Sequence, residues 1–156
     1  MESKEKTSLT TSLILLLSIS CGVVVANMYY IQPIGTKVAA SLSVSTSAVG
    51  ILTMLTQLGY ALGLLFLVPL GDVVDRPKLI IRMAALSAIS LLAAFFAPSF
   101  TLFACASFLI GLLSIVPQII IPYGAVLAGP KARGKVMGTL LSGCLLYTSD
   151  AADDLI

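Results

Sequence analysis

The chain has 156 residues, of which 58% are hydrophobic and only 10% are charged, and it contains no His and no Trp. An ordinary soluble domain carries roughly 25% charged residues, so this composition excludes a soluble fold with a normal polar surface. Three scattered cysteines are too few for a disulfide framework and do not form a metal-binding motif. Because helices satisfy every backbone hydrogen bond within one segment in lipid, the composition predicts an all-α integral membrane protein.

Crossing the hydrocarbon core takes about 20 apolar helical residues. The hydropathy pattern predicts four complete transmembrane helices and a truncated fifth, at residues 11–30, 47–70, 79–97, 100–127 and 136–143. Residues 35–46, 71–78 and 98–99 form the first three connections, and such short connections make consecutive helices antiparallel neighbours. A signal peptide is the alternative for the first segment, since Lys4 and Lys6 precede it, but it lacks a clear cleavage site and further spans follow. In the fourth span, Pro117 and Pro122 remove backbone donors and should bend the helix.

Basic residues gather on alternate connections. Only Lys37 lies on one side of the predicted topology, and the other side carries Lys4, Lys6, Arg76, Lys78, Arg82, Lys131, Arg133 and Lys135. The positive-inside rule places this second side, with the N-terminus, in the cytoplasm. The same alternation argues against a nucleic-acid-binding patch.

A charged connection at residues 71–78 carries the most specific motif. Gly71 has no Cβ and permits a tight turn, while Asp75 and Arg76 place charge at the membrane edge. The pattern Gly71-x-x-x-Asp75-Arg76 between the second and third spans resembles the signature loop of the major facilitator superfamily. The resemblance implies a gating loop made by Gly71, Asp72, Asp75 and Arg76, in which the acidic residue acts as a latch toward a second half of the carrier. A solvated turn that merely obeys the positive-inside rule is the alternative.

Three further stretches resemble one bacterial branch of that superfamily, related to twelve-span drug:proton antiporters. They are Ala26-Asn27-Met28-Tyr29-Tyr30-Ile31-Gln32-Pro33, Gln57-Leu58-Gly59-Tyr60-Ala61-Leu62-Gly63 and Ser114-Ile115-Val116-Pro117-Gln118. The resemblance implies a carrier in the bacterial inner membrane, built from two six-helix halves that rock around a central cavity. This chain would hold most of the first half. Its partners would be lipid, a small-molecule substrate and the missing C-terminal half, with no cofactor and no nucleic acid.

Several polar side chains lie within or at the ends of the predicted spans. A polar side chain that faces lipid is costly, so such residues should face other helices or a wet cavity. We expect these residues to line the substrate path: Asn27, Tyr30, Gln32, Gln57, Tyr60 and Gln118. The alternatives are hydrogen bonds that join helices and tyrosines that act as interfacial anchors. Two Gly-x-x-x-Gly pairs, Gly59 with Gly63 and Gly134 with Gly138, should let helices pack closely.

Apart from the flanking Arg82, no Asp, Glu, His, Lys or Arg lies inside a predicted span. A proton relay needs a titratable group within the membrane, so any relay would lie in helices outside this chain. We expect a fragment of a secondary transporter that exports small organic molecules by alternating access. The alternatives are a proton-independent uptake facilitator and a small four- or five-span assembly partner without transport activity. No nucleophile–base pair, metal cluster or phosphate-binding glycine loop is present in the sequence, which argues against an enzyme.

The last residues depart from the apolar pattern of the fifth span. Cys144-Leu-Leu-Tyr-Thr-Ser-Asp-Ala-Ala-Asp153 is reproduced by translating TGT-CTC-TTA-TAC-ACA-TCT-GAC-GCT-GCC-GAC, which resembles a common transposase-based sequencing adapter. We therefore expect residues 1–143 to be carrier sequence and residues 144–156 to be a translated adapter. A natural acidic C-terminus is the alternative, and the codons decide between the two.

Overall fold

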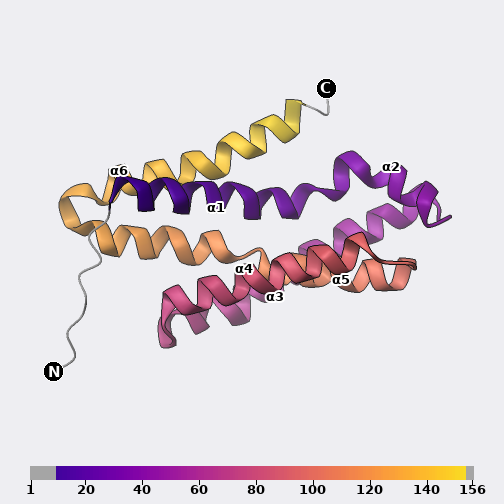
Figure 1. Ribbon diagram of the computed structural model, residues 1–156, viewed down its shortest axis with the longest axis horizontal. Helices are drawn as coiled ribbons and strands as arrows, with labels where there is room; N and C mark the ends of the chain where they lie inside the picture. Colours follow the sequence, from indigo (N-terminus) through magenta and orange to yellow (C-terminus); the bar gives the residue numbers. More distant parts are fainter. Residues whose placement is uncertain (1–9, 154–156) are drawn as a thin grey trace.

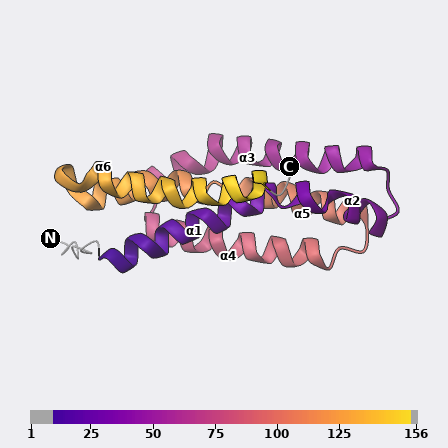
Figure 2. The same ribbon diagram turned by 90° about the horizontal axis from the view of Figure 1, so that it is seen from above.

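The computed structural model describes residues 10–153, and the side chains of residues 10–146, as a bundle of helices (Figures 1 and 2). The elements are α1 (Thr11–Tyr29), α2 (Ile31–Ser41), α3 (Thr46–Val73), α4 (Arg76–Phe95), α5 (Phe100–Leu113) and α6 (Val116–Asp153). Four helical stretches of the described chain are long and apolar enough to cross a membrane: Thr11–Tyr29, Thr46–Val73, Arg76–Phe95 and Phe100–Leu146. The predicted all-α membrane fold is thereby confirmed.

The long helix α6 reverses direction at Gly129, so it forms two antiparallel arms. Gly129 has a φ of 69°, which glycine adopts without steric cost, and Pro130 begins the second arm. A Cβ built on Gly124 would lie 2.7 Å from Leu140 Cδ1, which places the two arms against each other. Figure 1 shows the second arm returning alongside α1. The helix that contains the fifth predicted span begins at Pro130, before residue 136, because its charged first turns are also helical.

The first two connections between the predicted spans contain fewer non-helical residues than expected, whereas the third, residues 96–99, contains more. Residues 35–46 are not a simple link, since α2 continues to Ser41. In the charged connection, α3 ends at Val73 and α4 begins at Arg76, so only two residues lie outside a helix. Gly71 consequently sits in the last turn of α3 and not in a tight turn. A Cβ at Gly71 would make only ordinary contacts of 3.6 Å, so its backbone does not require glycine.

The fourth predicted span is interrupted between α5 and α6, at Ser114 and Ile115. Pro117 follows the interruption and has no N–H to donate to the carbonyl group four residues earlier. Ser114 is the C-cap residue of α5, and its side chain donates a hydrogen bond to the carbonyl oxygen of Ile110 at 2.6 Å. Pro122 lies inside α6, and the helix continues through it.

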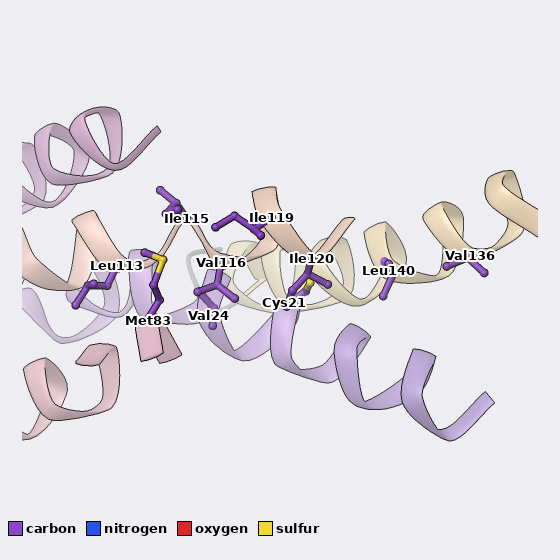
Figure 3. Close-up of a cluster of buried hydrophobic side chains, with 10 residues drawn as sticks. All are labelled: Cys21, Val24, Met83, Leu113, Ile115, Val116, Ile119, Ile120, Val136 and Leu140. Atoms are coloured by element: carbon purple, nitrogen blue, oxygen red, sulfur yellow. The ribbon is translucent and has the colours of Figure 1, made fainter. Parts of the chain in front are cut away.

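Helix α5 and the first arm of α6 follow each other end to end across the interruption, and we call them together the central rod. The central rod lies at the centre of the bundle. In its most apolar 18-residue window 61% of the residues are buried, against 22% in each of the other three spans. One apolar cluster surrounds the start of α6 and joins α1, α4 and the second arm of α6 (Figure 3): Cys21, Val24, Met83, Leu113, Ile115, Val116, Ile119, Ile120, Val136 and Leu140. A second cluster fills the other end: Ile31, Leu52, Ala94, Phe103, Ala106 and Ile110.

Glycines permit a close crossing of α3 over α5. A Cβ on Gly63 would lie 2.5 Å from the carbonyl oxygen of Leu112, and one on Gly111 would meet the backbone of Thr56. Gly59 is similarly close to α5, so the first glycine pair packs as expected. The second pair does not, because Gly134 and Gly138 have no neighbour within 4 Å of such a Cβ.

The basic side chains of the described residues separate between the two ends of the bundle. Figures 1 and 2 show that the start of α1, the α3–α4 connection and the Gly129 turn lie at one end, while the α2–α3 and α4–α5 connections lie at the other. The first end carries Arg76, Lys78, Arg82, Lys131, Arg133 and Lys135, and the second carries Lys37. Lys4 and Lys6 lie outside the described residues.

Candidate functional site

Two of the six polar candidates, Tyr60 and Gln118, meet between α3 and α6, and a third, Gln57, lies about one turn away on α3. The side-chain nitrogen Nε2 of Gln118 donates to the hydroxyl oxygen of Tyr60 at 3.0 Å. Gln118 stands in the first turn of α6, directly after the interruption of the central rod. Gln57 precedes Tyr60 by three residues, which places it on the same face of α3 about one turn away. We call Gln57, Tyr60 and Gln118 the α3–α6 polar group.

The α3–α6 polar group retains hydrogen-bonding capacity toward a ligand. Gln57 and Gln118 are exposed and Tyr60 is half-buried. After the bond to Gln118, the hydroxyl of Tyr60 still has a hydrogen to donate, and each glutamine amide has an acceptor oxygen. The ring of Tyr60 also offers an aromatic face. The group can therefore bind hydrogen-bonding and aromatic organic molecules without supplying a charge.

Tyr30 lies elsewhere in the bundle. Its hydroxyl oxygen is 3.3 Å from the hydroxyl oxygen of Ser107, which is fully buried in α5. This contact joins the α1–α2 junction to the central rod. Tyr30 also lines an apolar pocket of about 340 Å³ together with Ile34, Leu91 and Phe103. The pocket does not include the α3–α6 polar group.

The remaining two candidates are separate again. Asn27 is half-buried and lines a groove of about 290 Å³ between α1 and α4, with Ser20 and Ser87. Gln32 is exposed on α2. The structure thus places the six candidates in several locations, and only the α3–α6 polar group brings more than one of them together.

The charged connection is held by two exposed ion pairs. Arg76 Nη2 is 2.8 Å from Asp72 Oδ1, and Arg76 Nε donates to the carbonyl oxygen of Gly71 at 3.1 Å. Arg76 therefore satisfies a carbonyl at the end of α3, where intrahelical partners run out. Lys78 Nζ is 3.1 Å from Asp75 Oδ2. Asp75 stands at the N-cap of α4 but accepts no side-chain capping bond from it.

Two serines that the sequence did not single out have structural roles. Ser107 meets Tyr30, and Ser87 is buried with no hydrogen-bond partner for its hydroxyl oxygen among the described residues. Serine is inconspicuous in an apolar helix because its hydroxyl commonly bonds to the carbonyl four residues earlier. Ser20 and Ser90 do so here. In the part of the chain that was described, no group of three or more His, Cys, Asp or Glu side chains could hold a metal ion.

Comparison with known proteins places this helical bundle in a family. Residues 15–146 match the model of the Major Facilitator Superfamily. "Uncharacterized transporter YgaY" of Escherichia coli O157:H7 and its counterpart in strain K12 are each 44% identical over 144 residues, covering 92% of this chain and 36% of the relative. "Probable transporter SCO4007" of Streptomyces coelicolor is 31% identical over 137 residues, covering 88% of this chain and 31% of that protein.

The chain thus spans about a third of the length of the curated relatives that it matches. No solved structure matches it significantly. The family match covers most of the first apolar helical stretch, the other three in full, and the buried residues of both core clusters. The signature pattern at Gly71, Asp75 and Arg76 lies within it. The chain belongs to the Major Facilitator Superfamily.

Proposed function

We propose that this chain is the N-terminal part of a carrier that exports small organic molecules from the bacterial cytoplasm by alternating access. The observation that carries the proposal is the α3–α6 polar group, in which Gln118 hydrogen-bonds to Tyr60 across two apolar helices. Polar side chains at membrane depth face the bundle interior or a water-filled cavity, since lipid cannot satisfy them. Substrate sites of such carriers lie near the midplane, between the repeats that move.

The chemistry of the polar group favours neutral or cationic organic substrates. No Asp, Glu, His, Lys or Arg occurs in the sequence between Lys37 and Asp72 or between Arg82 and Lys131, which are the segments around the group. Amide and phenol groups bind by hydrogen bonds, and the face of Tyr60 can attract a cation. An anionic substrate would find no compensating charge in these segments.

The charge distribution supports an orientation with the N-terminus in the cytoplasm. The bundle end with six basic residues would face the cytoplasm, according to the positive-inside rule. The α3–α4 connection would then be a cytoplasmic gating element. Exposed ion pairs such as Asp72–Arg76 and Asp75–Lys78 contribute only about 0–1 kcal/mol each, so their members can exchange partners at little cost. A carboxylate of this connection can therefore bind a basic group of the other half in one state and release it in another.

The test is transport by the complete gene product. We would express it in bacteria that lack their major exporters and follow labelled neutral, cationic and anionic compounds in inverted membrane vesicles. Gln118→Ala and Gln57→Ala should each lower transport about fivefold, the equivalent of one hydrogen bond of about 1 kcal/mol. Gln32→Ala, on the exposed face of α2, is the matched control and should leave transport unchanged.

The same assay separates the alternatives. Transport that persists after the proton gradient is collapsed would identify a facilitator, and its direction would show uptake or export. If the complete protein moves none of the compounds in either direction, the carrier proposal fails and an assembly role is favoured. Equal effects of the Gln32 and Gln118 substitutions would remove the α3–α6 polar group from the substrate path.

A further inference from the structure

A small pocket with two basic side chains lies between the end of α3 and the first two turns of α4. The pocket measures about 140 Å³, and its lining consists of Leu70, Val74, Asp75, Lys78, Leu79 and Arg82. Both helices pack mainly on α5, so the pocket is a gap between their neighbouring ends. Figure 1 shows this connection at the end of the bundle that also carries the Gly129 turn. We call it the Arg82 pocket.

The charges of the pocket leave one cation without a partner. Asp75, the carboxylate in the lining, is paired with Lys78 at 3.1 Å. Arg82 has neither an ion pair nor a hydrogen bond with any described residue. Two basic side chains and one carboxylate give the lining a net charge of +1. The guanidinium of Arg82 is therefore available to an anion from outside the described chain.

Arg82 lies where apolar side chains surround it. It follows the start of α4 by six residues, which is about 9 Å along the helix axis. Its neighbours Ile81 and Leu86 are 67% and 51% exposed, and they belong to a helix that is apolar enough to cross a membrane. An arginine near a helix end extends its guanidinium along such apolar surface to the headgroup layer. A phospholipid presents its phosphate in that layer, whereas a soluble anion would have to leave bulk water to reach it.

We propose that the Arg82 pocket binds the phosphate of an anionic phospholipid in the leaflet at this end of the bundle. The planar guanidinium of Arg82 donates two parallel hydrogen bonds to phosphate oxygens. Lys78 adds a second positive charge one turn closer to the helix start, and Leu70 and Val74 flank the glycerol. Basic pockets between transmembrane helices suit anionic headgroups. The positive lining favours them over zwitterionic headgroups, which carry a cation of their own.

The first test measures the lipid affinity of the complete carrier, whatever its substrate and direction of transport. The carrier in detergent is titrated with phosphatidylglycerol or phosphatidylcholine, and native mass spectrometry gives the bound fraction. Phosphatidylglycerol should bind about tenfold more tightly than phosphatidylcholine, and Arg82→Gln should remove about tenfold of its affinity. Arg133→Gln is the matched control, because it removes an exposed arginine at the same end but outside the pocket. It should leave the affinity unchanged.

The outcomes separate a built site from diffuse attraction. Equal losses of affinity in the two variants, or no loss in Arg82→Gln, would overturn the proposal. Displacement of the lipid by inorganic phosphate would identify a soluble anion as the ligand and would overturn it as well. Arg82→Lys keeps the charge but not the planar fork, so it should lose less affinity than Arg82→Gln. Since Arg82 is exposed, Arg82→Gln should keep the Tm of the unchanged carrier, which separates lost binding from lost folding.

The second test locates the lipid. A photoreactive amino acid replaces Val74, a 40% exposed residue of the lining, in the complete carrier in vesicles with equal amounts of the two lipids. Phe96, which is 73% exposed at the other end of α4, is the control position. Illumination should give mainly phosphatidylglycerol adducts at Val74 and equal adducts of both lipids at Phe96. Equal adducts at Val74, or adducts with another segment of the protein, would overturn the proposed occupant.

Discussion

Replacing Gly63 by Ala should destabilise the bundle, although alanine favours helices more than glycine does. The new Cβ would lie 2.5 Å from the carbonyl oxygen of Leu112 and 2.8 Å from Cγ2 of Ile115. Ile115 can rotate, but the Leu112 carbonyl is backbone and cannot. Restoring an ordinary contact requires α3 and α5 to separate by about 1 Å, and a gap of this size forfeits roughly a quarter to a half of each dispersion contact.

The expected free-energy change follows from two opposing effects. Overpacking of a tight contact costs about 1–3 kcal/mol, and the higher helix propensity of alanine returns about 0.5–1 kcal/mol. Gly63→Ala should therefore lower the free energy of unfolding by about 1–2 kcal/mol, since van der Waals packing dominates helix association in membranes. Gly111→Ala should cost more, because the three atoms nearest its Cβ all belong to the backbone of Thr56.

Gly50 provides a matched control on the same helix. A Cβ at Gly50 would meet nothing within 4 Å, so Gly50→Ala adds the same methyl group to α3 without a collision. Thermal unfolding of the complete carrier in detergent should give an unchanged or higher Tm for Gly50→Ala and a lower Tm for Gly63→Ala. If Gly63→Ala is as stable as Gly50→Ala, α3 and α5 do not cross at these glycines and the packing argument is wrong.

The membrane spans could be predicted because crossing lipid demands long apolar runs. The pattern could not show where the helices end, since hydropathy reports the surroundings of a residue and not its backbone conformation. The second arm of α6 begins at Pro130, although Lys131, Arg133 and Lys135 are charged. Helix α2 likewise continues past Lys37 to Ser41. In both places, backbone hydrogen bonds continue where apolar side chains stop.

Which polar residues form the site depends on tertiary contacts, and no local sequence pattern predicts these contacts. Tyr60 and Gln118 are 58 residues apart, and they meet because α3 crosses α5 at glycines and α6 starts anew before Pro117. Asn27 is equally polar in sequence, yet it lines a different groove. Sequence could predict that such residues avoid lipid. Which of them meet depends on how the helices pack.

Three further predictions test separate parts of this description. Tyr60→Phe and Gln118→Leu each remove the 3.0 Å hydrogen bond. In transport assays the free-energy effect of the double variant should therefore be smaller than the sum of the two single effects by about 0.5–1.5 kcal/mol. Strict additivity would show that the two side chains act independently. Ser99→Ala removes the side-chain oxygen that accepts a hydrogen bond from the backbone amide of Leu102 at 3.4 Å. Thermal unfolding should show a free energy of unfolding that is lower by about 0.5–1 kcal/mol. An unchanged stability would show that this long bond does not cap α5. Sequencing the source DNA should give TGT-CTC-TTA-TAC-ACA-TCT-GAC-GCT-GCC-GAC for Cys144–Asp153, and any other codon choice refutes the adapter interpretation.

The two contacts that α3 makes with the central rod differ in stiffness, and this difference relates the fold to transport. At α5 the contact is made by glycine backbones, which have no side chain to rotate and hold the helices at a fixed distance. At α6 it includes Tyr60 and Gln118, long side chains that can rotate toward a ligand. The interruption at Ser114 and Ile115 separates the two contacts. Substitutions at the glycines should therefore change stability, while substitutions at the α3–α6 polar group should change transport and leave stability nearly intact. A variant of Gln118 that unfolded as readily as one of Gly63 would contradict this division.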